Sequence, residues 1–152
     1  MPDGDTEADW RERGESLLTS DQCAEALDFY ACILEDHPDD PAAWVGQARA
    51  LLGLDRYDEA LAAANQALTL DPEYAAGYRA RGNSFFWLKR YDEALEAANQ
   101  ALAIDPTRAS AWDLKARALA ELKRHDEASI CFDRAIELAP MTATSGTIRA
   151  SS

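Results

Sequence analysis

The chain has 152 residues, 47% of them hydrophobic, which is enough for one domain with its own core. Its 28 acidic residues outnumber the 15 basic ones, and a formal charge of -13 disfavours binding to nucleic acid or to anionic membrane surfaces. Three cysteines without a CxxC pair give no disulfide framework. With no apolar run as long as a membrane span and no basic, apolar leader, these features predict a cytoplasmic protein.

The sequence repeats itself with a period of 34 residues. Three columns carry the period: an aromatic one (Trp10, Trp44, Tyr78, Trp112), an alanine one (Ala26, Ala60, Ala94, Ala128) and a proline one (Pro38, Pro72, Pro106, Pro140). The period divides the chain into four units, 7–40, 41–74, 75–108 and 109–142. Apolar residues recur at helical spacing in two stretches of each unit, so every unit is predicted to be a helix pair.

In chain order, residues 1–6 are expected to be disordered, and the first unit follows. Its second helix should stop at Pro38, because proline lacks the backbone N–H and rejects helical geometry in the residue before it. Asp40 and Pro41 then predict a capped start of the second unit. Asp-Glu steps at 58–59, 92–93 and 126–127 place negative charge at the starts of the second helices of the later units.

The second and third units share almost the same sequence over residues 56–68 and 90–102, which suggests a duplication. After the fourth unit, residues 143–152 are rich in Ser and Thr and are expected to form a flexible tail. Small residues at two columns should let the two helices of a unit approach closely. These are Gly14, Ala48, Gly82 and Ala116 on the first helices, and the alanine column on the second.

The aromatic, small, alanine and proline columns resemble the tetratricopeptide repeat, over four tandem copies from residue 7 to about 142. This resemblance implies an all-α fold, a right-handed α-α superhelix of eight helices. It also implies a scaffold without catalytic activity, whose first helices line a concave groove that binds a peptide or a helix of a partner protein.

The centre of this groove is predicted on the third unit. Arg79, Asn83, Phe86 and Trp87 are spaced i, i+4, i+7 and i+8, so they share one face of a helix. Phe85 falls in a leucine column and belongs in the core, which leaves the two rings after it as candidate anchors for a partner. Packing of one of them against the neighbouring repeat remains the alternative.

Five more residues fall in the inward columns: Arg11, Glu15, Arg49, Asp113 and Arg117. The inward arginines would suit an acidic peptide or a free C-terminus, because guanidinium groups fork onto carboxylates. Their pairing with acidic side chains of the chain itself is an equally open alternative. Arg79 and Asn83 resemble the start of a clamp with which one branch of the family binds chaperone tails, but Leu114 replaces its next asparagine, so this clamp is not predicted.

The last predicted helix carries four apolar residues that no further unit would cover: Ile130, Phe132, Ile136 and Leu138. They predict self-association into a homo-oligomer as the second functional class, with a solvated end as the alternative. Cysteines and histidines lack the spacing of a nucleophile with its base or of metal ligands, so no catalytic residue, metal or cofactor is predicted.

Overall fold

The computed structural model describes residues 7–138, and this range contains eight α-helices and no strand. The expected disorder of residues 1–6 and the expected tail at 143–152 lie outside the described residues. The helices are α1 (Glu7–Thr19), α2 (Cys23–Asp36), α3 (Pro41–Gly53), α4 (Tyr57–Leu70), α5 (Ala75–Trp87), α6 (Tyr91–Ile104), α7 (Ala109–Glu121) and α8 (His125–Leu138). The prediction of an all-α fold with eight helices is therefore confirmed.

Each first helix ends in the same turn, built around one residue with left-handed backbone geometry. In the second repeat this residue is Asp55, with φ 63°, and its N–H bonds the carbonyl of Leu52 at 3.1 Å. The next N–H, that of Arg56, reaches back to the carbonyl of Leu51 at 2.9 Å. This pair of bonds satisfies carbonyls that the helix end leaves open. The equivalent residues of the other repeats are Asp21, Lys89 and Lys123, with φ between 62° and 68°.

Each turn between repeats is tied to the next first helix by an aromatic side chain. The indole Nε1 of Trp44 donates to the carbonyl of Pro38 at 2.9 Å, and the hydroxyl of Tyr78 donates to that of Pro72 at 3.0 Å. At the start of α3, Asp40 accepts a bond from the Ala42 N–H at 3.0 Å, which is the predicted cap. The aromatic column of the sequence thus supplies the donor, and the proline column the acceptor, of one recurring hydrogen bond.

Small residues let the helices of a repeat pack closely, as their columns predict. Ala26, Ala60 and Ala94 are completely buried, and so are Ala48 and Ala116 opposite them. Most of the core consists of alanine at the helix contacts, with larger side chains filling the space between repeats.

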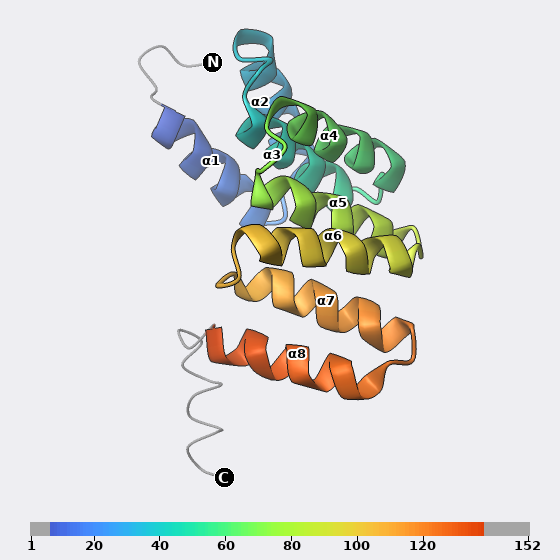
Figure 1. Ribbon diagram of the computed structural model, residues 1–152. Coiled ribbons are helices and arrows are strands. Elements are labelled where there is room, and N and C mark those ends of the chain that lie inside the picture. The colour runs from blue at the N-terminus through green and yellow to red at the C-terminus, as the bar shows by residue number, and fades with distance from the viewer. Residues whose placement is uncertain (1–6, 139–152) are drawn as a thin grey trace.

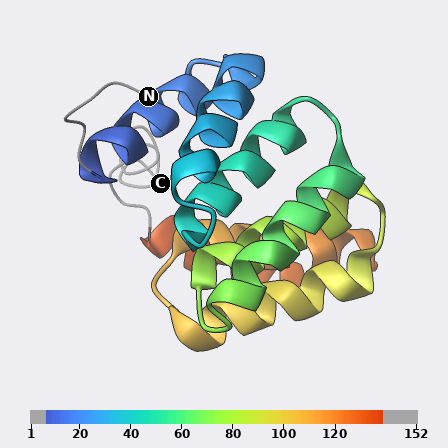
Figure 2. The ribbon, with the colours of Figure 1, turned by 90° about the horizontal axis from the view of Figure 1, so that it is seen from above.

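The stack curves because its two layers of helices differ in spacing. Each helix packs on the next along the chain, and the first helices α1, α3, α5 and α7 also contact one another in succession. No comparable contact joins successive second helices within residues 7–138. The first helices therefore form the inner, concave side of a superhelix, and Figures 1 and 2 show the direction of the helices turning along the stack. Over the described part of the chain, no helix is both long and apolar enough to cross a membrane.

Candidate functional site

A groove of about 860 Å³ lies on the concave side and spans the first three repeats up to the start of α7. Its lining includes five of the predicted site residues: Arg11, Glu15, Arg49, Arg79 and Asn83. They come from α1, α3 and α5, because the inward columns of successive first helices lie side by side in the stack. These five residues thus line one continuous surface across three repeats.

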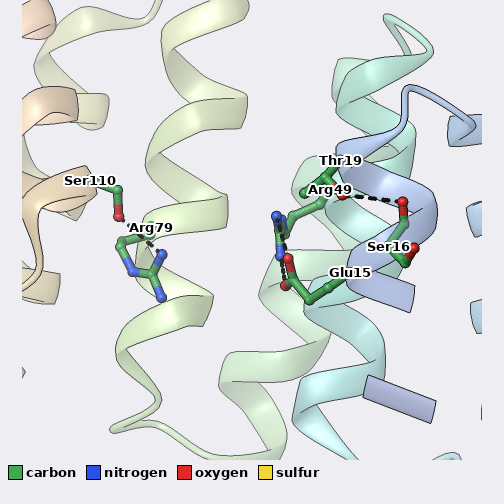
Figure 3. A network of polar contacts seen from close by, with 6 residues as sticks. All are labelled: Glu15, Ser16, Thr19, Arg49, Arg79 and Ser110. Carbon is green, nitrogen blue, oxygen red and sulfur yellow. Dashed lines mark hydrogen bonds and ion pairs between the residues drawn. The ribbon is translucent and has the colours of Figure 1, made fainter. Parts of the chain in front are cut away.

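Arg79 occupies the middle of this groove and is only partly satisfied by the protein. Its Nη1 donates to the hydroxyl of Ser110 on α7 at 3.2 Å (Figure 3). Its Nε is buried and has no hydrogen-bond partner among the described residues. A buried donor without a partner costs about 1–3 kcal/mol, more when the group is charged. Arg79 therefore has unused capacity to bind an anion.

The surroundings of Arg79 strengthen this demand for negative charge. Burial lowers the pKa of the Arg79 guanidinium, and the nearby positive charges of Arg108 and Arg49 lower it further. Arginine stays protonated even so, because its ordinary pKa lies far above neutral pH. The side chain therefore holds its charge in a place where water and neighbouring groups compensate it poorly.

Arg49 is already paired inside the protein. It forms an ion pair with Glu15 of the preceding repeat, and its Nη2 donates to Glu15 Oε1 at 3.3 Å (Figure 3). Both side chains are about half exposed, so the pair contributes little to stability, about 0–1 kcal/mol. For Arg49, the alternative of pairing within the protein therefore holds. The pair still lines the groove, and Arg49 can exchange the Glu15 carboxylate for that of a ligand.

Asp113 and Arg117 do not line the groove. They pair with each other along α7, with Arg117 Nε 3.1 Å from Asp113 Oδ2. The spacing of four residues along one helix allows this contact without a partner from another repeat. This part of the predicted lining is therefore an exposed ion pair beyond the end of the groove.

Phe86 and Trp87 also lie outside the groove lining, near the C-terminal end of α5. Trp87 lies about 12 Å further along the helix axis than Arg79, given the rise per residue of an α-helix. Its ring is stacked on Tyr57 at 6.0 Å between centroids, and Phe86 meets Tyr91 edge-on at 5.5 Å. Trp87 remains 49% exposed, whereas Phe85 is buried as expected. The two rings belong to an aromatic cluster at the turn between α5 and α6.

The groove also contains residues that the inward columns did not identify. Tyr74 and Arg108 lie immediately before first helices, and Ile104 ends α6. They reach the groove because the turns between repeats lie beside the N-terminal ends of the first helices. The sequence does contain a signal for Arg108 and Tyr74: they share a repeat column with Asp40, at a spacing of 34 residues, directly before each first helix.

Tyr30 forms part of the groove floor between the first two repeats. Its ring is 3% exposed and packs where Gly14 and Gly46 leave room. Burial raises the pKa of the Tyr30 hydroxyl to about 12, and the negative charge of Glu15 adds to the rise. The phenol is therefore neutral and the floor is mainly apolar at physiological pH.

At the other end of the stack, three of the four residues predicted for self-association are exposed. Ile130 is 67% exposed, Ile136 39% and Phe132 37%, whereas Leu138 is half-buried. Self-association through them stays a prediction. Within residues 7–138, no cluster of three or more His, Cys, Asp or Glu side chains is arranged to hold a metal ion.

The repeat columns, the helix pairs and the concave groove together define a solenoid of helical repeats, and family comparisons give this class its name. One family model described as tetratricopeptide repeat matches residues 11–75 and, again, residues 45–109, and a second model of the same description matches residues 88–146. The chain belongs to the tetratricopeptide repeat family. Among curated proteins, none matches the chain at a significant level.

Several solved structures share the fold. A thermophilic TPR protein of Thermus thermophilus is 21% identical, with a TM-score of 0.81 over 93% of this chain and 78% of its own. MamA is 18% identical, with a TM-score of 0.69 over 87% of this chain and 77% of its own. The first TPR of Spaghetti (RPAP3), bound to the HSP90 peptide SRMEEVD, is 24% identical, with a TM-score of 0.67 over 75% of this chain and 90% of its own.

Proposed function

We propose that this chain is a protein-interaction scaffold without catalytic activity, which holds a segment of a partner protein in its concave groove. A carboxylate of that segment docks on Arg79. The observation that carries the proposal is the buried Arg79 Nε, which has no partner within residues 7–138 and lies beside an Nη1 bound to a serine hydroxyl. A carboxylate can accept two parallel bonds from a guanidinium, which a hydroxyl cannot.

The charge of the groove supports an acidic ligand. Among the described residues, its lining holds four arginines and two acidic residues, in a chain whose formal charge is -13. The arginines are Arg11, Arg49, Arg79 and Arg108, and the acidic residues are Glu15 and Asp105. Such a local positive surface attracts an acidic segment, while the acidic remainder of the molecule repels it from other sites. The ligand is therefore an acidic peptide segment or a free C-terminus.

The apolar floor gives the remaining contact area. Val45, Ala76 and Ala80 line the groove beside Arg79, together with the ring of Tyr30. Small side chains leave a shallow surface on which the backbone of an extended segment can lie close to the helices. The carboxylate then fixes the position of the segment, and its neighbouring side chains add apolar contact.

Peptide binding has a precedent in the same fold. The RPAP3 domain was solved with the peptide SRMEEVD, which contains three acidic residues. Its identity to this chain is 24%, so the likeness supports only that this fold can bind peptides. The ligand proposed for this chain is therefore argued from the residues of its own groove. Because the composition of this chain predicts a cytoplasmic protein, the proposed partners are soluble cytoplasmic proteins.

Binding of fluorescein-labelled heptapeptides tests the proposal, with each sequence made with a free and with an amidated C-terminus. Acidic peptides should bind the wild type, and Arg79→Glu should weaken them by about tenfold or more. Arg117→Glu is the matched control, because it makes the same change at an arginine outside the groove. Circular dichroism checks that both variants fold. Absence of selective binding, or equal loss in both variants, would contradict the proposal.

A further inference from the structure

The outer face of α8 differs from that of every other second helix in the described part of the chain. Each of α2, α4 and α6 packs against the first helix of the next repeat, whereas α8 stands at the end of the stack with α7 on one side (Figure 1). Phe132 and Ile136 occupy the columns that this packing covers elsewhere. Ala64 and Ala98 are fully buried in the first column, and Leu68 and Leu102 are 8% exposed in the second.

A row of acidic side chains runs beside these two apolar residues. Asp133 and Glu137 directly follow Phe132 and Ile136, so they project about 100° further around the helix. Asp126 lies on the same side, seven residues before Asp133, and all three are exposed. We define Phe132, Ile136 and this acidic row as the α8 end face.

Among the second helices of the described residues, α8 alone carries the complete acidic row. In the same three columns, each second helix that the chain covers carries one acidic residue: Glu35 on α2 in the column of Glu137, and Asp58 and Asp92 on α4 and α6 in the column of Asp126. The column of Asp133 is uncharged in all three, with Ala31, Asn65 and Asn99. The end face thus combines the apolar columns of an internal repeat with three acidic side chains where each internal repeat has one. One of the three, Glu137, forms an exposed ion pair with Arg134 on α8 at 3.4 Å, so Asp126 and Asp133 carry the excess negative charge. An occupant with apolar contact and positive flanks would satisfy both features.

We propose that the α8 end face binds an amphipathic helix of a partner protein, with an apolar row flanked by lysines or arginines. The partner helix would lie where the next first helix lies in an internal repeat. Its apolar row would cover Phe132 and Ile136, and its basic flank would meet Asp126 and Asp133. This surface is separate from the concave groove, so one scaffold could hold two different segments at once.

Other occupants fit less well. A second copy packed with its own α8 would set two acidic rows against each other. A second copy stacked through α1 would bring an acidic residue of the sequence, Asp9, to the column where internal repeats have Ala43, Gly77 and Ala111, small uncharged residues that are buried. The sequence after α8 is also a poor match for a covering first helix. Gly146 stands in the aromatic column, where Tyr78 and Trp112 pack with Leu102 in internal repeats.

Fluorescence anisotropy with designed helical peptides tests the proposal. The probe carries a leucine row flanked by lysines. One control peptide has glutamates in place of the lysines, and another has the probe's composition in scrambled order. The lysine peptide should bind the wild type, and the scrambled peptide, which has the same charge, should bind about tenfold more weakly or less.

Two substitutions on the same helix locate the binding. Ile136→Glu should weaken the lysine peptide by about tenfold, whereas Ile130→Glu should leave it unchanged, because Ile130 points to the opposite side of α8. Arg79→Glu should also have no effect, which separates this surface from the groove. Equal binding of probe and scrambled peptides, or equal effects of the two α8 substitutions, would overturn the proposal. So would a dimer in light scattering that Ile136→Glu abolishes, because a second copy would then be the occupant.

Discussion

The indole Nε1 of Trp112 donates a 2.8 Å hydrogen bond to the backbone carbonyl of Pro106, six residues earlier. The bond fixes the turn between the third and fourth repeats against the helix that follows it. Trp44 and Tyr78 make the same contact in the two repeats before. The contact explains why the aromatic column tolerates either ring: both carry a donor at their far end.

Replacing Trp112 by phenylalanine should therefore lower the free energy of unfolding by about 1–2 kcal/mol, through the lost hydrogen bond and some lost apolar area. Trp112→Tyr should cost less, because a tyrosine already makes this bond at position 78. Urea unfolding of the two variants measures the difference. Equal destabilisation by both would mean that the hydrogen bond contributes nothing.

Gly46 is required by the ring of Tyr30. A Cβ at position 46 would lie 2.2 Å from Tyr30 Cε1, and the buried ring has no room to move away. Gly46→Ala should therefore destabilise the protein by about 1–3 kcal/mol through overpacking. The next repeat has alanine at both equivalent positions, Ala64 and Ala80, which share one buried cluster.

A double-mutant cycle tests this reciprocity. In a Tyr30→Ala background, Gly46→Ala should cost little or stabilise the helix, because alanine has the higher helix propensity by about 1 kcal/mol. Additive effects of the two substitutions in urea unfolding would show that the ring and the glycine do not interact.

Lys89 adopts a backbone conformation that suits glycine better. Its φ of 65° is unfavourable for a residue with a Cβ, by about 1–2 kcal/mol. Lys89→Gly should therefore stabilise the protein by roughly 0.5–1 kcal/mol, after the greater freedom of glycine in the unfolded chain is subtracted. As a control, Glu96→Gly at an exposed position further inside α6 should destabilise by about 1 kcal/mol. Thermal unfolding of both variants gives the comparison, and the same sign of change at both positions would refute the explanation.

Tyr30 should make the protein sensitive to alkaline pH. Its pKa is about 12 in the folded state against 10.0 for a free tyrosine, because burial disfavours the charged phenolate. A raised pKa in the fold stabilises the protein fully below pH 10.0, and this contribution is lost as pH rises through about 12. Tyr30→Phe should weaken this alkaline loss of stability. Tyrosinate absorbance should lose its last ionisation step in the variant, and an unchanged upper part of the titration would contradict the assignment.

Repeat pattern and helix order could be predicted from the sequence because they depend on columns of residue type that recur every 34 positions. Asp40, the alanine column and Phe85 lie where their patterns predict. The residues that line the groove were harder to predict. A repeat column gives the direction in which a side chain points around its helix, but it does not say which side chains of other helices lie beside it. Trp87 and Arg79 share a helical face but lie about 12 Å apart along it, and only Arg79 reaches the hollow.

The partners of the inward arginines could not be predicted for the same reason. Arg49 and Arg117 occupy the same column in different repeats, yet one pairs with Glu15 across repeats and the other with Asp113 along its own helix. Which carboxylate lies within reach depends on the superhelical stacking, which the sequence period does not specify. The contribution of Arg108 depended on the turn before α7, which brings that side chain toward the groove.

The central claim, a carboxylate bound at Arg79, is tested most directly by NMR of its Nε–Hε group, assigned by comparison with Arg79→Lys. On addition of the acidic heptapeptide that binds most tightly in the fluorescence series, this resonance should move in the direction of a newly formed hydrogen bond, with the Arg117 resonance unchanged. Saturated peptide binding with an unmoved Arg79 resonance would contradict the account.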